Sequence, residues 1–319
     1  MRLSLAIVLL VVVPVAAAPH NEDDQATAVA EIKKAGGTVK RDGKRPGKPV
    51  VAVDLQRRKF TDAGLAQLAG LTHLQTLVLN RTQVTDGGLE YLQRLTDLRS
   101  LDLGFTQVTD AGLEHLKRMT RLQALDLSNT KVTDKGLERL QAMAGLQTLN
   151  LQFTQVTDDG LAHLEGLTHL QSLNLNDTKV TDAGLVHLKG LTGLQELWLG
   201  GTKVTDAGLA ELKGLTRLQT LNLSSTKVTD VGLADLKGLT NLQNLGLGFT
   251  QVTDAGLAHL EGMIRLQVLA LSRTKVTDAG LAHLKGMTRL QVLLLSGTKV
   301  TDAGISSLKK ALPKAQIIR

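Results

Sequence analysis

The hydrophobic positions of this chain follow a pattern that repeats every 24 residues from about residue 50 to the C-terminal end. The unit that starts at Leu74 reads L-x-x-L-x-L-x-x-T-x-V-T-D-x-G-L-x-x-L-x-x-L. The Thr-Asp pair of this unit recurs without insertion or deletion, beginning at Thr61, Thr85, Thr109, Thr133, Thr157, Thr181, Thr205, Thr229, Thr253, Thr277 and Thr301. A fixed period of this length indicates a stacked repeat architecture, in which each unit buries its apolar side against its neighbours.

Each unit contains two hydrophobic periods. Leu77 and Leu79 alternate with polar residues, which predicts a short strand with one buried face. The leucines that follow the Thr-Asp pair recur at every third position, which predicts one buried stripe of a short helix. Either Thr85 or Asp86 is suited to cap the amino end of that helix, and the sequence leaves this choice open. Gly88 lowers helix propensity, so we expect it to permit close approach of neighbouring turns.

One strand and one short helix per 24 residues, with L-x-x-L-x-L at the strand, resembles the leucine-rich repeat family. The resemblance covers roughly residues 50–319, with ten successive strand motifs and a degenerate one at Val50-x-x-Val53-x-Leu55. Thr82 and its equivalents occupy the position where the family usually has Asn or Cys. The helix start is similar to repeats of F-box substrate receptors and to exported repeat proteins of planctomycete-like bacteria. The resemblance implies an α/β horseshoe, with a parallel concave sheet of about eleven short strands and short helices on the convex side.

The chain is expected to divide into four parts. Residues 1–17 resemble a signal peptide, with an apolar stretch and a cleavage site after Ala17, although retention as an uncleaved anchor stays open. Residues 18–49 are predicted to form a basic N-terminal cap, with a helix over 22–35 and then a loop. Residues 50–307 carry the repeats. Residues 308–319 are predicted to form a C-terminal cap whose core side chains are Leu308, Leu312, Ile317 and Ile318.

The charge is concentrated near the N-terminal end. The chain has a formal net charge of +7, and the segment from Lys33 to Lys59 contains ten basic residues against Asp42 and Asp54. This segment is a candidate for binding an anionic envelope polymer or a membrane surface. Its candidate side chains are Lys40, Arg41, Lys44, Arg45, Arg57 and Arg58. The absence of cysteine excludes disulfides and thiolate chemistry.

Candidate binding residues lie at the strand positions that vary between units while the leucines do not. Exposed aromatic residues are favoured anchors at protein interfaces, although the phenylalanines also have the option of packing sideways against adjacent turns. A small apolar patch is expected near the C-terminal end, where a partner or a second copy could cover it. The candidate partner-binding residues are Trp198, Glu196, Phe105, Phe153, Phe249, Asp102, Asp126, Val268, Val292 and Leu294.

The sequence contains no motif typical of a catalytic or cofactor site. A histidine recurs at one helix position, at His115, His163, His187, His259 and His283, but one surface column does not supply the three or four converging ligands of a metal site. A catalytic site normally interrupts such a grid with a long insertion, and none occurs. We therefore predict no enzyme activity, no metal and no cofactor.

The sequence as a whole favours a non-catalytic scaffold that is periplasmic, bound to the cell envelope or secreted by a bacterium, and that binds a protein partner on its concave face. The first alternative is attachment to an anionic envelope polymer or membrane surface through the basic cap. The second is an adaptor similar to the substrate receptors of the F-box leucine-rich repeat class. Neither the partner nor the oligomeric state follows from the sequence.

Overall fold

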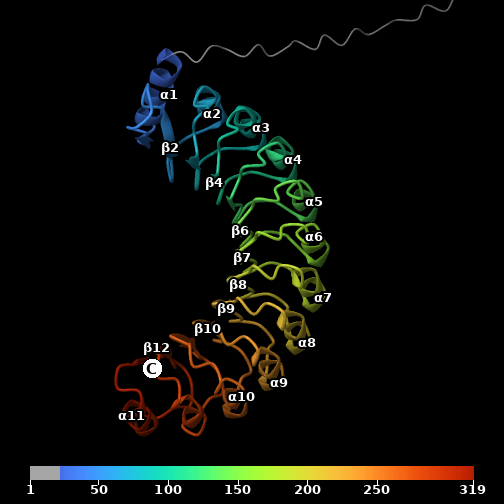
Figure 1. The fold of residues 1–319 in the computed structure, drawn as a ribbon, viewed down its shortest axis with the longest axis vertical. Coiled ribbons are helices and arrows are strands. Elements are labelled where there is room, and N and C mark those ends of the chain that lie inside the picture. Colours follow the sequence, from blue (N-terminus) through green and yellow to red (C-terminus); the bar gives the residue numbers. More distant parts are fainter. Residues whose placement is uncertain (1–21) are drawn as a thin grey trace, which may run out of the picture.

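The computed structural model describes residues 22–319, which form one curved solenoid with its strands on the inner side and its helices on the outer side (Figure 1). The predicted signal segment, residues 1–17, lies outside the described residues. The horseshoe architecture expected from the repeat pattern is confirmed.

The described residues form one sheet of thirteen strands in chain order. All neighbours are parallel except β1 and β2, which form an antiparallel pair. The sequence predicted about eleven strands, and the two strands at the ends, β1 and β13, account for the difference. The strands are β1 (Thr38–Arg41), β2 (Val50–Asp54), β3 (Thr76–Val78), β4 (Ser100–Asp102), β5 (Ala124–Asp126), β6 (Thr148–Asn150), β7 (Ser172–Asn174), β8 (Glu196–Trp198), β9 (Thr220–Asn222), β10 (Asn244–Gly246), β11 (Val268–Ala270), β12 (Val292–Leu294) and β13 (Gln316–Ile318).

Short helices return the chain along the convex side. The α-helices are α1 (Glu22–Lys34), α2 (Asp62–Leu68), α3 (Asp86–Leu89), α4 (Asp110–Leu113), α5 (Asp134–Glu138), α6 (Asp158–Ala162), α7 (Asp182–Leu185), α8 (Asp206–Leu209), α9 (Asp230–Leu233), α10 (Asp254–Ala258) and α11 (Asp302–Ala311). The 3₁₀ helices are η1 (Glu90–Arg94), η2 (Glu114–Leu116), η3 (Val186–Leu188), η4 (Ala210–Leu212), η5 (Ala234–Leu236) and η6 (Gly280–Leu284).

The N-terminal helix α1 covers the first layer of the core. It ends at Lys34, and the chain then turns at Gly36, which has a φ of 78° and is followed by a Gly37 N–H that donates to the Ile32 carbonyl at 2.8 Å. The buried stripe of α1 consists of Ala28, Val29 and Ile32. The apolar residues Ala26 and Ala30 of the same helix are exposed.

The Thr-Asp pairs perform two separate tasks, which resolves the question of the cap. Thr109 is the N-cap of α4, with extended backbone and a hydroxyl that accepts the Ala111 N–H at 3.2 Å. The preceding aspartate, Asp86, accepts the Thr109 N–H at 2.7 Å and its hydroxyl at 2.6 Å. Equivalent bonds run from Asp62–Thr85 to Asp278–Thr301. Threonine occupies the N-cap position of every α-helix from α2 to α11, but its hydroxyl accepts a capping hydrogen bond only in α4 and α7–α11, and Thr85 of α3 makes none. In each of these links, the aspartate that follows the threonine ties that helix to the next unit.

The glycine of the motif makes room for this link. A Cβ atom at Gly160 would lie less than 3.0 Å from the Asp134 carboxylate of the preceding unit. That carboxylate already accepts the Thr157 N–H at 2.8 Å and the Thr157 hydroxyl at 2.7 Å. The glycine thus serves the close approach of neighbouring turns, as the sequence predicted.

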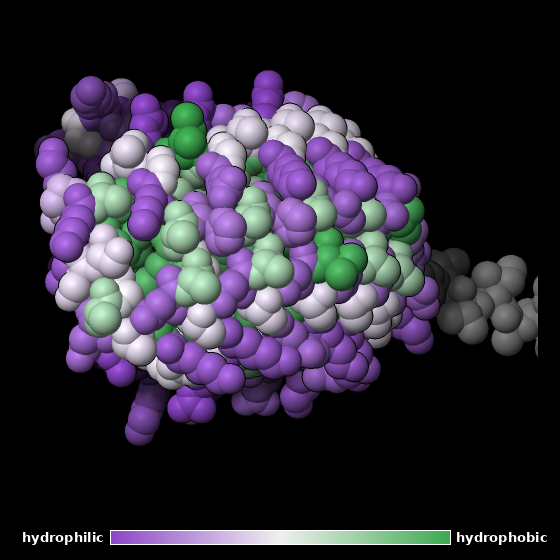
Figure 2. Space-filling view, turned by 90° about the horizontal axis from the view of Figure 1, so that it is seen from below, coloured by the Kyte–Doolittle hydropathy of each residue, from purple (hydrophilic) through white to green (hydrophobic). Residues whose placement is uncertain are grey.

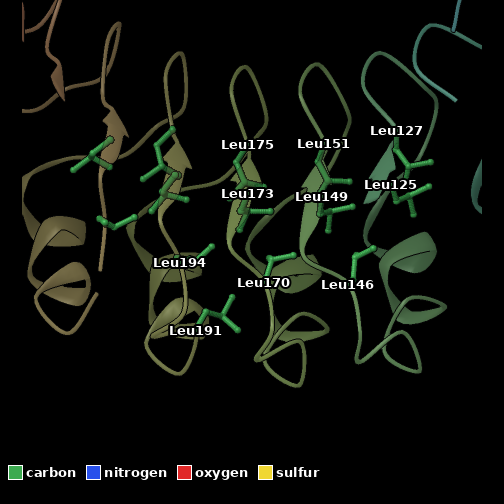
Figure 3. Packing of buried hydrophobic residues seen from close by; sticks show 14 of the residues in the cluster. Leu125, Leu127, Leu146, Leu149, Leu151, Leu170, Leu173, Leu175, Leu191 and Leu194 are labelled. Carbon is green, nitrogen blue, oxygen red and sulfur yellow. The ribbon is translucent and has the colours of Figure 1, made fainter. Parts of the chain in front are cut away.

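The core consists of leucine layers between sheet and helices, with one layer per unit (Figure 3). Leu149, Leu151 and Leu173 are fully buried, and burying a leucine contributes about 1.5–3 kcal/mol. The buried Thr82 hydroxyl donates to the Leu79 carbonyl at 2.6 Å, within its own turn, and this bond recurs along the threonine column.

The last core layer differs partly from the sequence expectation. Leu308 and Leu312 are buried as expected, and Ile317 packs partly buried against the same cluster. Ile318 was wrongly placed in the core, because it is 40% exposed. Strand β13 aligns it with Leu294, so the alternation of the strand turns its side chain outward.

Candidate functional site

The concave surface consists of the two strand residues that flank each buried central leucine. In β8, Leu197 is fully buried while Glu196 and Trp198 are partly exposed. In the register of the sheet, Trp198 lies between Asn174 and Asn222. The structure therefore places Glu196 and Trp198 on the same open face, near the middle of the solenoid.

Two acidic residues lie side by side toward the N-terminal end of this face. Asp102 in β4 is directly opposite Asp126 in β5. Asp102 accepts the Gly104 N–H at 2.9 Å, and Asp126 accepts the Asn150 side-chain amide at 2.8 Å. Among residues 22–319, no basic side chain forms an ion pair with either carboxylate. This pair gives the concave face a local negative charge that its own side chains do not neutralise.

The environment of Asp102 disfavours its charged form. Burial raises the pKa of the Asp102 carboxyl above its ordinary value of 3.8, and the neighbouring Asp126 charge raises it further. The hydrogen bond from Gly104 acts in the opposite direction without reversing the shift.

Replacing Asp102 with asparagine is expected to stabilise the protein at neutral pH. A folded-state pKa above 3.8 means that the folded protein holds the proton more tightly, so stability falls as pH rises from 3.8 through the raised pKa. The gain of Asp102→Asn should therefore shrink toward zero as pH falls below that window. Urea unfolding at several pH values measures the difference in unfolding free energy between the variant and the wild type. Asp159→Asn is the control, because it removes the same charge from an exposed position. A variant less stable than the wild type at neutral pH would contradict the expectation.

A second row of side chains follows the carboxyl ends of the strands, and we call it the left-handed ridge. Its members all have positive φ, from 49° at Asn129 to 73° at Gly297. This conformation costs a residue with a side chain roughly 1–2 kcal/mol, and it is uncommon for bulky residues. The ridge consists of Arg57, Arg81, Phe105, Asn129, Phe153, Asp177, Gly201, Ser225, Phe249, Arg273 and Gly297.

The three candidate phenylalanines, Phe105, Phe153 and Phe249, all lie on this ridge. Phe153 is 48% exposed and Phe249 is 56% exposed, so neither is buried against an adjacent turn. The Arg81 guanidinium lies 3.9 Å from the centre of the Phe105 ring, and the Arg273 guanidinium lies 5.3 Å from the Phe249 ring. Sideways packing thus describes Phe105, while Phe153 and Phe249 present open aromatic surface.

The apolar patch near the C-terminal end is present on the concave face. Val268 is opposite Val292 in the sheet, and Leu294 lies between Ala270 and Ile318. Ile318 extends the patch by one strand beyond the sequence expectation.

The candidate residues form an extended surface rather than one pocket. Asp102 lies on β4 and Leu294 on β12, which is eight strand spacings or roughly 40 Å apart at about 4.8 Å each. Three clusters result: the acidic pair with Phe105, the centre around Trp198, and the C-terminal apolar patch. A surface of this length suits an extended partner better than a small substrate.

The basic residues of the N-terminal cap do not form one compact site. Lys40 and Arg41 lie on β1, where Arg41 donates to the Lys48 carbonyl at 3.0 Å. Arg45 pairs with Asp42 at 3.3 Å in the loop that contains Lys44. The remaining two residues belong to the first turn of the repeats: Arg57 starts the left-handed ridge, and Arg58 packs over Gly36.

The histidine column lies on the convex side, and four of its five members, all except His259, contact a side chain of the preceding unit. His187 contacts Glu165 at 2.6 Å, His283 contacts Glu261 at 2.6 Å, and His115 contacts Gln93 at 2.8 Å. Within residues 22–319, no three His, Asp or Glu residues converge in a way that could hold a metal ion. In the same part of the chain, no helix has the length and apolar character needed to cross a bilayer.

Figure 2 faces the C-terminal units of the solenoid from below, and on that face most hydrophobic groups are separated by hydrophilic ones. Exposed apolar side chains also occur on the helices of the convex side, such as Val186 on η3 and Val231 on α9. Single exposed side chains of this kind are ordinary on protein surfaces.

Sequence reasoning missed the conformation of the ridge and the arginines that stack on it. The signal was available: Gly201 and Gly297 occupy the same column as the phenylalanines, and glycine is the residue that a positive φ favours. The reading also passed over Arg217 and Arg265, which precede the first leucine of their strand motifs.

Comparison with known proteins supports the architecture. A family model described as leucine rich repeats (2 copies) matches residues 192–238 and 216–262, and a model described as leucine rich repeat matches residues 70–92, 94–117, 119–140, 146–164 and 166–188. A search of curated proteins gave no match.

Solved structures share the fold. An internalin C2 from Listeria monocytogenes is 30% identical, covering 78% of this chain and 94% of that chain, with a TM-score of 0.53. An internalin (inlF) from the same species is 23% identical over 93% and 94% of the two chains, with a TM-score of 0.62. The ectodomain of the Arabidopsis receptor kinase HAESA, solved with a peptide hormone, is 18% identical over 87% and 50%, with a TM-score of 0.64. With repeat matches along more than half of its length, the chain belongs to the leucine-rich repeat family.

Proposed function

We propose that this protein is a non-catalytic scaffold that binds a protein partner along its concave face and left-handed ridge. The observation that carries the proposal is the exposure of Phe153 and Phe249 in a backbone conformation that disfavours them. Packing does not explain this arrangement, because the rings remain open to solvent. Strained, exposed aromatic residues are typical of sites where a binding role outweighs stability.

The adjacent surface is suited to the same task. Trp198 and Glu196 lie on the strand side, while the aromatic rings lie at the strand ends. Aromatic anchors surrounded by polar groups are the usual composition of the centre and rim of a protein interface. The solved HAESA ectodomain complex contains a peptide hormone, which supports a peptide or protein as the class of partner for a surface of this architecture.

We further propose that the scaffold acts outside the bacterial cytoplasm, in the periplasm, at the cell envelope or in the medium. The apolar segment near the N-terminal end and the small residues before position 18 support this location. Polymer attachment through the basic cap is less favoured, because Arg41 and Arg45 are engaged within their own hairpin. The F-box-like adaptor remains a third hypothesis, without a structural observation that favours it.

The double variant Trp198→Ala with Phe153→Ala is expected to weaken capture of the partner from an envelope extract about thirtyfold or more. Loss of a hot-spot aromatic residue typically costs at least about 2 kcal/mol, and each 1.4 kcal/mol corresponds to a factor of ten. The matched control is Val186→Ala with Val231→Ala, which removes two exposed apolar side chains from the convex side.

Site-specific photocrosslinking gives an independent measurement. A benzophenone amino acid at position 153 or 249 should produce a discrete adduct, whereas the same group at position 231 should not. Equal adducts from the convex position, or equal loss of capture in the control variant, would refute the proposal.

A further inference from the structure

A polar depression of about 270 Å³ lies at the amino ends of β8, β9 and β10. It is therefore at the opposite edge of the sheet from the left-handed ridge, which follows the carboxyl ends of the strands. Its lining contains two arginines and four amides but no acidic side chain and no aromatic ring. These residues are Gln195, Arg217, Gln219, Asn241, Gln243 and Arg265.

The two guanidinium groups have no carboxylate partner. Arg217 and Arg265 occupy the same position in units two apart, with Asn241 between them. Arg265 donates to the Asn241 side-chain oxygen at 2.5 Å, and Asn241 donates to the Thr216 carbonyl at 2.8 Å. Among the ion pairs of residues 22–319, none involves either arginine, so both charges are available to a ligand.

An internal comparison shows that ion pairing differs along this column: Arg289, at the same position in the unit after Arg265, also has no ion pair among residues 22–319, whereas Arg121 does. Arg121 occupies the equivalent position nearer the N-terminal end, and there it pairs with Asp97 at 2.7 Å. Asp97 is itself a member of this column, and it also contacts His73 at 3.4 Å. The same column is thus neutralised at one end of the solenoid and cationic at the depression.

The floor of the depression is a row of amides. The Gln243 side chain donates to the Gln219 side chain at 3.4 Å, and the backbone N–H of Gln219 donates to the Gln195 carbonyl at 2.7 Å. Each amide carries both donor and acceptor atoms, which match the hydroxyl groups of a sugar. The absence of an aromatic ring from the lining removes the stacking platform that single-stranded nucleic acids use.

We propose that this depression binds an acidic polysaccharide. The two guanidinium groups hold anionic groups roughly 10 Å apart, which is two strand spacings, and the amides hydrogen-bond the hydroxyls between them. Carboxylate and sulfate groups both suit a guanidinium fork, so the shared chemistry is an anionic sugar chain.

The test uses the folded protein with polygalacturonate oligosaccharides, dextran sulfate and uncharged dextran as probes in calorimetry or biolayer interferometry. One or both acidic chains should bind and dextran should not. Arg217→Gln with Arg265→Gln should weaken binding about a hundredfold, since each charge-assisted contact corresponds to about a tenfold change. Binding of polygalacturonate, of dextran sulfate or of both identifies carboxylate, sulfate or either group as the anionic ligand.

The matched control is Arg121→Gln with Arg139→Gln, which removes the same charge from two arginines that are already paired with Asp97 and Glu114. This control should leave binding nearly unchanged. Gln219→Met, which changes no charge, should weaken binding measurably if the amides contact the sugar. Equal losses in the two arginine pairs, no binding of either acidic chain, or equal binding of single-stranded DNA would overturn the proposal.

Discussion

Replacing Gly160 with alanine is expected to lower the free energy of unfolding by about 3 kcal/mol. The added methyl group would meet the Asp134 carboxylate of the preceding unit at less than 3.0 Å. Overpacking of this kind costs about 1–3 kcal/mol, and displacement of the carboxylate also weakens its two hydrogen bonds to Thr157. Equilibrium unfolding in urea measures the loss.

A double-mutant cycle separates the collision from a general loss of structure. Asp134→Ala alone should destabilise the protein because the Thr157 donors lose their acceptor. The combination of Gly160→Ala with Asp134→Ala should cost clearly less than the sum of the single changes, since the colliding group is gone. Gly166→Ala is the matched control, because a Cβ atom there meets no atom within 4 Å. Strict additivity in the cycle would argue against the contact.

Replacing Leu173 with alanine is expected to cost about 2–5 kcal/mol. The side chain is fully buried in the central layers of the solenoid, between the leucines of adjacent units (Figure 3). Each unit contacts only its neighbours, so the cavity weakens the contact between the repeats on the N-terminal side of this unit and those on its C-terminal side. Amide hydrogen exchange should therefore accelerate most in the units next to β7.

Two controls frame this expectation. Leu173→Met keeps the volume of the side chain and should cost less than about 1.5 kcal/mol. Val231→Ala changes a side chain that is 73% exposed and should alter stability by about 0.5 kcal/mol or less. A Leu173→Ala protein as stable as the Val231→Ala protein would show that the leucine layers do not determine stability.

The repeat pattern predicted most of the fold because packing imposes it on every unit. The alternation around Leu77 and the threefold spacing after Gly88 correspond to strand and helix in unit after unit. Segments outside the grid were less predictable. Strand β13 forms by pairing with β12, and this pairing also sets the outward position of Ile318. The local hydrophobic pattern of residues 316–318 does not predict it.

The candidate site was predictable in position but not in conformation. The variable columns identified Trp198 and the phenylalanines, since an alternating strand must place them away from the core. The positive φ of the ridge arises from the turn after each strand, where Phe, Arg and Asp occur as well as Gly. The lateral depression was missed because its charge depends on which arginines lack a partner, and ion pairing between units is a three-dimensional property.

The Asp–Thr links of successive helices have a consequence for how this protein can change over time. Every link joins one unit to the next by the same two hydrogen bonds. Loss or duplication of 24 residues therefore rebuilds the same junction, while the distance between Phe153 and Phe249 changes by one strand spacing of about 4.8 Å. The distance between two contact residues can therefore change in steps of one strand spacing while the packing between units stays the same.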